Sequence, residues 1–305
     1  MYILVTKQLI TMAIIGLGGF IFARIFKVNE SERKFLSKLL MYFINPTMVL
    51  NSFNRDFDSQ KLVLLGIVVL LSLIIHVVMI MLGIFTCKEK IDRLAIAFTN
   101  CGFIGIPLIR GVFGDEGVIF LMGYLAIFNI LVWTYGYHQL SGTSKIIKVI
   151  TNPNIIAVAL GVVIFCMPFT LPDVIGRPLS LVADTNTAIS MVLVGVLIAD
   201  FHPSESKKVL PRLVKMSLLR LVVCSVINIV ILFAAYKMIG NMDGARMIIF
   251  VVLICSLCPV ATSIPSLACL FDQDAAYASL TVSLTSILCI ITLPGFVALA
   301  ELIIK

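Results

Sequence analysis

Long apolar runs separated by short polar connections recur along the whole chain. Most of them approach or exceed the roughly 20 residues that a helix needs to cross a bilayer. We place these runs near 8–26, 36–53, 62–86, 94–111, 118–138, 153–171, 179–200, 213–237, 246–270 and 277–302. The pattern predicts an all-α polytopic membrane protein with about ten transmembrane helices.

The composition supports this interpretation, because 60% of the 305 residues are hydrophobic, 13% are charged and the mean hydropathy is +1.12. A soluble domain has no means of burying so large an apolar fraction. The net charge of +7 raises the question of nucleic acid. However, the Lys and Arg residues lie beside apolar runs without interleaved aromatic residues, so we expect the lipid bilayer as a partner and no nucleic acid.

The basic residues are divided unevenly between the two sides of this layout, and fifteen of the 23 fall on one side. The fifteen are Arg24, Lys27, Arg33, Lys34, Lys38, Lys88, Lys90, Arg93, Lys145, Lys148, Lys207, Lys208, Arg212, Lys215 and Arg220. The positive-inside tendency places this side in the cytoplasm. We therefore expect a multi-pass protein of the cell (cytoplasmic) membrane with both termini outside.

Dividing the predicted spans into two halves of five gives the halves opposite orientations in the membrane. We expect residues 1–138 to form the first five-helix repeat and residues 139–152 to form a cytoplasmic connection. Residues 153–305 then form the second, inverted five-helix repeat.

Similarity between the halves supports such a repeat. A shift of 158 residues places Ile106, Pro107 and Phe113 on Ile264, Pro265 and Phe271. Two helices rich in glycine and proline also match by chance over so short a stretch, and this alternative stays open.

Two proline-containing segments, Asn100–Pro107 and Pro259–Pro265, interrupt long apolar runs at corresponding positions of the two halves. Proline cannot donate the helical hydrogen bond and clashes with the preceding turn, so each segment is expected to break its helix near the bilayer midplane. The freed backbone groups are tolerated only where protein or a wet cavity satisfies them. Interrupted spans at matching positions therefore predict a transport site.

Residues 99–108, with the sequence TNCGFIGIPL, and the following Gly111-Val112-Phe113-Gly114 resemble the fourth-helix crossover of the auxin efflux carrier family. Further similar blocks are Asn45-Pro46 of the second helix, Asn152-Pro153-Asn154 of the sixth, residues 195–199 of the seventh and Leu293-Pro294 of the tenth. The long hydrophilic loop of the plant auxin exporters is absent between the fifth and sixth runs. The resemblance therefore favours a bacterial-type permease, similar to those proposed for malonate or malate.

The resemblance implies a fold like that of bile-acid symporters, with a scaffold domain and a transport domain that each take helices from both repeats. Helices four and nine are expected to be broken and to cross at their breaks. Helix N-termini at such a crossing would present unpaired N–H groups and partial positive charge, which suit a carboxylate. The expected function is a secondary transporter or uniporter that moves small organic anions, mono- or dicarboxylates, by alternating access.

Asn100 is the principal candidate for substrate binding, because its amide offers a donor and an acceptor at the break without a full charge. The alternative is that Asn100 caps the following half-helix. Further candidate substrate-binding residues are Asn45, Gly102, Asn186, Thr262 and Ser263. Pro107, Pro259 and Pro265 are expected to shape the helix breaks rather than to touch substrate.

Asp184 and His76 are candidates for ion coupling, because ionisable groups inside membrane spans are costly and usually functional. If the seventh span begins later than we place it, Asp184 is a carboxylate of the preceding loop. The alternative for His76 is a structural role, in which its ring bonds to a neighbouring backbone carbonyl. The coupling ion, Na⁺ or H⁺, and the choice between monomer and homodimer stay open. We expect no cofactor, and no metal site, because Cys255-x-x-Cys258 lacks the second ligand pair that zinc requires.

Two other classes of function were weighed against a carrier. An intramembrane enzyme would pair Asp184 with a carboxylate such as Asp200, but sixteen residues of helix separate these side chains by about 24 Å, too far for a dyad. A membrane sensor would normally need a soluble output domain, and the sequence encodes none. We therefore expect no catalytic residue and no enzymatic activity.

Overall fold

The computed structural model describes residues 1–54, 58–142, 147, 150–167, 170–199 and 209–304. In these ranges the chain is helical and forms no strand, so the all-α prediction is confirmed. Before residue 142 the helices are α1 (Tyr2–Phe26), α2 (Glu30–Leu39), α3 (Asn45–Phe53), α4 (Ser59–Thr86), α5 (Lys90–Ala97), α6 (Ile106–Leu131) and α7 (Tyr137–Ser141). After residue 150 they are α9 (Pro153–Phe165), α10 (Asp173–Asp184), α11 (Asn186–Ala199), α13 (Leu210–Leu218), α14 (Cys224–Ile239), α15 (Ala245–Leu257), α16 (Ser263–Leu270) and α17 (Ala275–Ile303).

Short π-helical turns, in which the helix widens by one residue, join several of these helices. They are η1 (Leu40–Ile44), η2 (Cys101–Gly105), η3 (Val132–Gly136) and η4 (Leu219–Val223). Pro46 and Pro107 each lie six residues after the start of a π turn, η1 and η2 respectively. A proline lacks the N–H group and clashes with the carbonyl four residues earlier, so widening the preceding turn relieves both conflicts.

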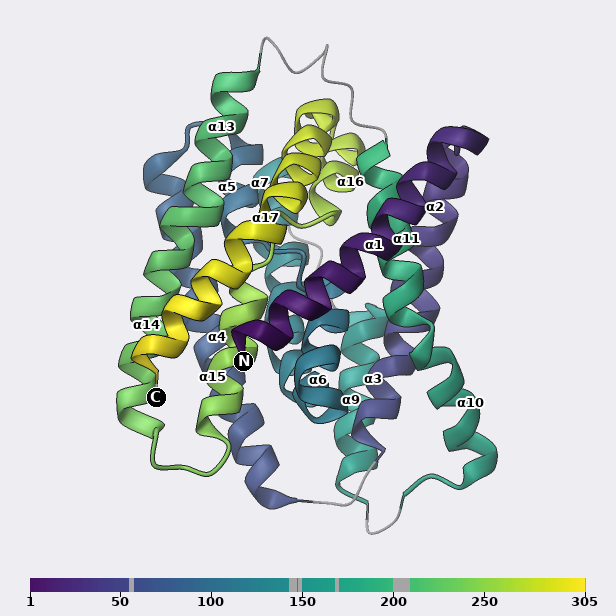
Figure 1. The fold of residues 1–305 in the computed structure, drawn as a ribbon, viewed down its shortest axis with the longest axis vertical. Coiled ribbons are helices and arrows are strands. Elements are labelled where there is room, and N and C mark those ends of the chain that lie inside the picture. Colours follow the sequence, from purple (N-terminus) through teal and green to yellow (C-terminus); the bar gives the residue numbers. More distant parts are fainter. Residues whose placement is uncertain (55–57, 143–146, 148–149, 168–169, 200–208, 305) are drawn as a thin grey trace.

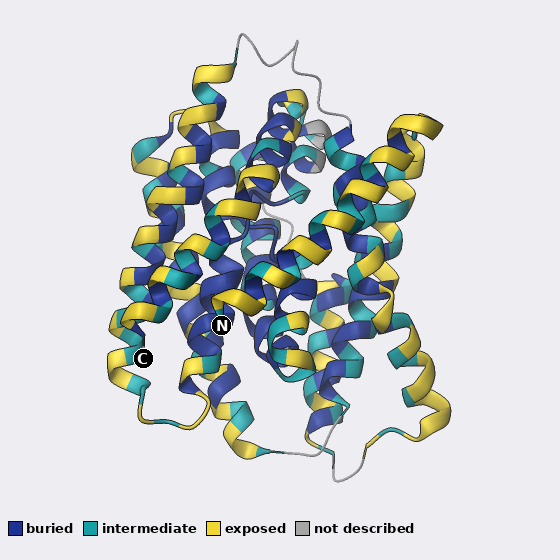
Figure 2. Cartoon of the chain, in the orientation of Figure 1, coloured by how far each residue is buried: buried dark blue, intermediate teal, exposed yellow. Residues whose placement is uncertain are grey.

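Six helical stretches of the described chain are long and apolar enough to cross a membrane. They are Tyr2–Phe26, Ser59–Thr86, Cys101–Ser141, Asp173–Ala199, Leu210–Ile239 and Ala275–Ile303, and two shorter apolar helices are Pro153–Phe165 and Ala245–Leu257. Large apolar side chains are exposed on the outer faces of α1 and α17, whereas α6 and α15 are mostly buried (Figure 2). A polytopic membrane protein is therefore consistent with the structure, and the count of ten spans stays a prediction.

The helices pack in two groups that each combine elements from both halves of the chain (Figure 1). In the first group, which we call the α1/α11 group, α1 packs along α11, and α3 packs on α9 and α10. In the second, the α4/α15 group, α4 packs on α5 and α6, α14 on α15, and α16 on α17. The expected scaffold and transport domains stay a prediction.

Glycines bring the backbones of α1 and α11 into direct contact. A Cβ atom at Gly195 would collide with the carbonyl oxygen of Gly16, and one at Gly19 would collide with the backbone of Val192. Small residues are the usual means by which membrane helices approach this closely.

The backbone adds a further correspondence between the two halves. Gly114 has a positive φ of 66° and Asp272 a positive φ of 50°, and 272 − 114 gives the same shift of 158 residues that aligns Pro107 with Pro265. Gly114 lies at a kink within α6, and Asp272 lies in the turn between α16 and α17. The inverted repeat itself stays a prediction.

One sequence assignment is wrong in the structure. Arg220, counted above among the basic residues of a cytoplasmic connection, lies inside the apolar stretch Leu210–Ile239 and is only 1% exposed. Four others of the fifteen, Lys145, Lys148, Lys207 and Lys208, lie outside the described residues, as does Asp200.

Candidate transport site

Each broken span has a short extended stretch between its half-helices, and the two stretches lie side by side. The first follows α5, which ends at Ala97, and the second follows α15, which ends at Leu257. Thr99 and Val260 form an isolated antiparallel bridge. The Asn100 N–H donates to the Pro259 carbonyl over 2.8 Å, and the Ala261 N–H donates to the Phe98 carbonyl over 3.1 Å. Each break thus satisfies backbone groups that the other leaves unpaired.

The breaks are shorter than the sequence indicated. Helix resumes at Cys101 in η2 and continues into α6, so Pro107 lies within helix and not at the end of an irregular turn. Pro265 is the third residue of α16, in a first turn that needs no N–H donor. Pro259 alone of the three prolines occupies an extended segment, and the preceding Cys258 has the extended ψ of 153° that a following proline favours.

Asn100 caps the helix that follows the first break and has a second polar atom without a partner. Its side chain is buried, with 4% exposed, and its Oδ1 accepts from the Phe103 N–H over 3.2 Å, which caps η2. Its Nδ2 has no hydrogen-bond partner. Because a buried donor without an acceptor costs about 1–3 kcal/mol, this amide nitrogen is available to an oxygen of a ligand.

The other polar candidates of the breaks lie close to the same junctions. Ser263, the first residue of α16, has a buried Oγ with no partner, and Thr262 precedes it with a half-buried side chain. Gly102 follows Asn100 by two residues, and a Cβ atom there would meet nothing within 4 Å. The second half of each broken span therefore begins with a buried polar atom that lacks a protein partner, and the first of them adjoins open space.

Asn45 and Asn186 form a separate polar pair in the α1/α11 group. The Asn186 Nδ2 donates to the Asn45 Oδ1 over 2.7 Å, and both residues are buried, with 0% and 3% exposed. Phe103 of η2 packs in one cluster with Leu40 and Ile44 of η1, the turn before Asn45, and with Leu193 of α11, the helix of Asn186. The structure thus brings the asparagine pair near the breaks through Phe103, without a described hydrogen bond between the two polar sets.

The two coupling candidates lie in different environments. His76 is fully buried in α4, its Nδ1 bonds to the Ser72 carbonyl over 2.7 Å, and its Nε2 has no partner. Its ring lies 4.9 Å from the ring of Tyr124. Asp184 is the last residue of α10, and its side chain is 58% exposed.

Asp184 takes part in a contact between the two helix groups. Arg110 of α6 bonds to the Asp184 Oδ1 over 2.7 Å, to the Ala183 carbonyl over 3.1 Å and, within α6, to Asp115 over 2.8 Å. Gln8 of α1 donates from Nε2 to the Pro107 carbonyl over 3.3 Å. Both bridges connect the α1/α11 group to the half-helix that follows the first break.

Arg220, which the sequence analysis did not consider for the site, connects the first halves of both broken spans. Arg220 donates from Nη1 to the Ile96 carbonyl of α5 over 3.0 Å and from Nη2 to the Cys258 carbonyl, at the end of α15, also over 3.0 Å. Its Nη2 also donates to the Ser256 carbonyl. The signal in the sequence was an arginine several residues inside an apolar run rather than beside it.

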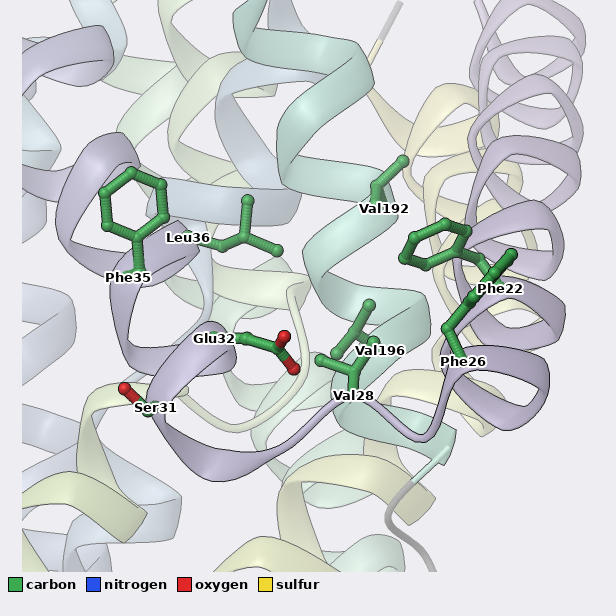
Figure 3. Close-up of a pocket in the computed structure, with 9 residues that line it drawn as sticks. All are labelled: Phe22, Phe26, Val28, Ser31, Glu32, Phe35, Leu36, Val192 and Val196. Atoms are coloured by element: carbon green, nitrogen blue, oxygen red, sulfur yellow. The ribbon is translucent and has the colours of Figure 1, made fainter.

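Two pockets lie along α1 and α11. One, of about 300 Å³, lies between α1, α11 and α17 and reaches Ile104 of η2; its walls are mostly apolar, with Ser286 as a polar member. The other, of about 750 Å³, lies between α1, α2 and α11, as Figure 3 shows, and is lined by Phe22, Phe26, Val28, Ser31, Glu32, Phe35, Leu36, Val192 and Val196. In the larger pocket, the Glu32 carboxylate accepts from the Asn29 N–H as part of a helix cap. The smaller pocket reaches η2, which follows the first break, and is therefore the better candidate to adjoin a transport site.

Comparison with known proteins gives one family match. A family model described as Membrane transport protein matches residues 3–149 and 139–297, which together span nearly the whole chain. No curated protein sequence matches the chain.

Proposed function

Because the chain belongs to the membrane transport protein family, which is also the auxin efflux carrier family, we propose that it is a secondary transporter or uniporter for small organic anions. The family consists of transporters rather than enzymes, and the resemblance described above led to the same family. The cell membrane is the proposed location, with ten spans and both termini outside.

The single observation that carries the choice of substrate is the Asn100 amide at the paired breaks. Its unpartnered Nδ2 lies at the N-terminus of the helix formed by η2 and α6, where backbone N–H groups and the helix dipole favour an anion. Ser263 offers a second unpartnered group at the start of α16. Neutral donors at helix N-termini suit a carboxylate, because they bind the anion without placing a fixed countercharge in contact with it.

The apolar pocket beside Ile104 narrows the proposal. A carboxylate that binds at Asn100 and extends toward this pocket would place its remaining atoms among Leu9, Met12 and Met191. Such walls favour a monocarboxylate with an apolar body over a dicarboxylate, whose second charge would lose its hydration without a partner.

Alternating access is the proposed mechanism, with the α4/α15 group moving against the α1/α11 group. The Arg110–Asp184 ion pair and the Gln8–Pro107 hydrogen bond connect the two groups through α6, the helix that follows the first break. These contacts would have to separate when the site opens toward that side, whereas the backbone pairing of the two breaks stays within the moving group.

Counterflow in proteoliposomes tests the function. Purified protein is reconstituted with unlabelled monocarboxylates or dicarboxylates inside, and uptake of the labelled compound is followed with and without Na⁺ or a pH gradient. We expect exchange of at least one carboxylate, with monocarboxylates preferred. Exchange of none of the panel, by protein shown to be folded, would contradict the proposal.

A further inference from the structure

Arg220 is a buried cation that donates four hydrogen bonds to backbone carbonyls and also contacts the Cys224 thiol. The side chain is 1% exposed and is the largest of the fully buried side chains in the described chain. It donates to the carbonyls of Ile96, Ser256 and Cys258, and no ion pair with Asp or Glu is found for it among the described residues. Charged side chains inside a membrane span are rare and usually have a function.

The accepting carbonyls belong to the C-terminal ends of two half-helices. Ile96 lies in the last turn of α5, Ser256 lies in the last turn of α15, and Cys258 follows α15 directly. Each helix C-terminus carries unpaired carbonyl groups and about half a negative charge. Two such ends side by side form a negative cluster of oxygens, which one guanidinium group neutralises.

In carriers with interrupted helices, unwound carbonyls and the C-terminal ends of half-helices are the groups that coordinate a coupling cation. Here carbonyls of the same type accept hydrogen bonds from the Arg220 side chain. We propose that Arg220 is a fixed internal cation that takes the position of a coupling cation, so that the breaks bind an anion without Na⁺ at this point. The inference deepens the proposed function and rests on it.

The local backbone explains how the side chain reaches this position. Arg220 is the second residue of η4, and a π turn displaces the residues within it from regular helical register. Arginine suits the role better than lysine, because its planar fork serves several carbonyls at once and it stays charged inside proteins. Cys258 lies one residue before Pro259, whose carbonyl accepts from the Asn100 N–H, so Arg220 and Asn100 support the same paired segments.

Removal of the side chain tests the inference by a measurement that needs no substrate. We would compare the melting temperatures of purified wild type, Arg220→Ala and Arg246→Ala in choline chloride, and then add millimolar guanidinium or Na⁺ at constant ionic strength. Arg246 is an exposed arginine at the start of α15 and serves as the matched control. We expect a rise of about 3 °C or more for Arg220→Ala alone, because a ligand that binds only the folded state stabilises it.

Equal responses of the three proteins to both cations would overturn the inference. If Arg220→Ala does not fold, Arg220→Lys and Arg220→Gln decide the question, because lysine keeps the charge and glutamine keeps neutral donors. The inference then requires Arg220→Lys to retain more of the wild-type melting temperature than Arg220→Gln. The same or higher value for Arg220→Gln would show that hydrogen bonding alone is needed.

Transport supplies the second measurement. With a substrate identified by counterflow, Arg220→Gln is expected to lose roughly tenfold or more in rate, as for a lost charged interaction, and wild type is expected to work without Na⁺. Transport by wild type that requires Na⁺, or full activity of Arg220→Gln, would contradict the inference. Failure of wild type to move any carboxylate would contradict the proposed function instead, and the melting temperatures would still decide the role of Arg220.

Discussion

Asn100 illustrates how one side chain divides its two polar atoms between folding and binding. The oxygen caps η2 through the Phe103 N–H, and the nitrogen is left without a partner. Whether Asn100 is a cap or a ligand was an open choice from the sequence, and the geometry accommodates both. The capping role is observed, and the binding role stays a prediction.

Asn100→Asp separates these roles. The aspartate keeps an oxygen for the Phe103 N–H but replaces the free donor by a second oxygen, which repels an anion. We expect folding to be preserved and substrate binding to weaken by more than the roughly 1–3 kcal/mol expected for Asn100→Ala, with partial recovery at low pH where the aspartate is protonated. Calorimetry with the substrate found by counterflow measures the affinity.

Asn29→Ala is the matched control for Asn100, because Asn29 caps α2 at a distance from the breaks. Its loss should lower stability by about 1 kcal/mol and leave affinity unchanged. If Asn100→Ala also leaves affinity unchanged, Asn100 is a cap and nothing more.

The buried Asn45–Asn186 pair predicts a coupling between two substitutions. Either single change to Ala leaves one amide unpaired and should cost about 1–3 kcal/mol, whereas the double change should cost less than the sum of the two. Chemical denaturation of the four proteins in detergent gives the coupling energy. Additive effects would show that the 2.7 Å hydrogen bond contributes no stability of its own.

At the scale of elements, Pro107 and the π turn before it belong together. In Pro107→Ala the new N–H group can bond to the Phe103 carbonyl, which favours a regular α-helix by up to about 3 kcal/mol. Removing the extra residue of a π turn rotates the preceding segment by about 100° relative to α6, which would displace Asn100 and Gly102. We expect transport to fall while the melting temperature stays the same or rises.

Pro178→Ala provides the comparison, since Pro178 is an exposed proline inside α10 and no π turn precedes it there. Its transport rate should stay at the wild-type level. A Pro107→Ala protein that transports normally would show that the π turn is not required.

The sequence predicted the two helix breaks but not how they pair with each other or which buried side chain holds them. Asn100 and Pro259 lie at the two breaks, because a proline disrupts its own helix, whereas Pro107 lies within the helix that follows the first break. The antiparallel pairing of Thr99 with Val260 depends on residues far apart in the chain, and no local pattern encodes it. Arg220 was missed because a basic residue near the end of an apolar run is usually a topology signal, and only packing shows that it points inward.

At the scale of the whole molecule, the predicted topology has a native reporter. Cys166, which follows α9, is exposed, whereas the other cysteines whose side chains are described are buried. With both termini outside, α9 ends on the outer side, so an impermeant maleimide should label intact cells at Cys166 and fail with Cys166→Ser. In that background, Lys34→Cys should react only after permeabilisation. Labelling of Lys34→Cys in intact cells would reverse the orientation.

The contact between the two helix groups predicts an effect on rate rather than affinity. Asp184→Asn removes one of two carboxylates from Arg110, and exposed pairs of this type contribute about 0–1 kcal/mol. We expect a change of a few fold in transport rate with unaltered substrate affinity and unaltered ion dependence. Loss of the dependence on a proton or sodium gradient would instead assign Asp184 to coupling.

The glycine contacts between α1 and α11 have a mechanical consequence. Where two backbones touch without side chains between them, sliding or twisting by even a small step produces a collision. We therefore expect α1 and α11 to move together as one rigid unit, so that any rocking motion of the carrier takes place at other contacts. Near the N-terminal end of α1, Gln8 reaches the Pro107 carbonyl through a long and adaptable side chain, and we expect the two helix groups to move against each other at this contact.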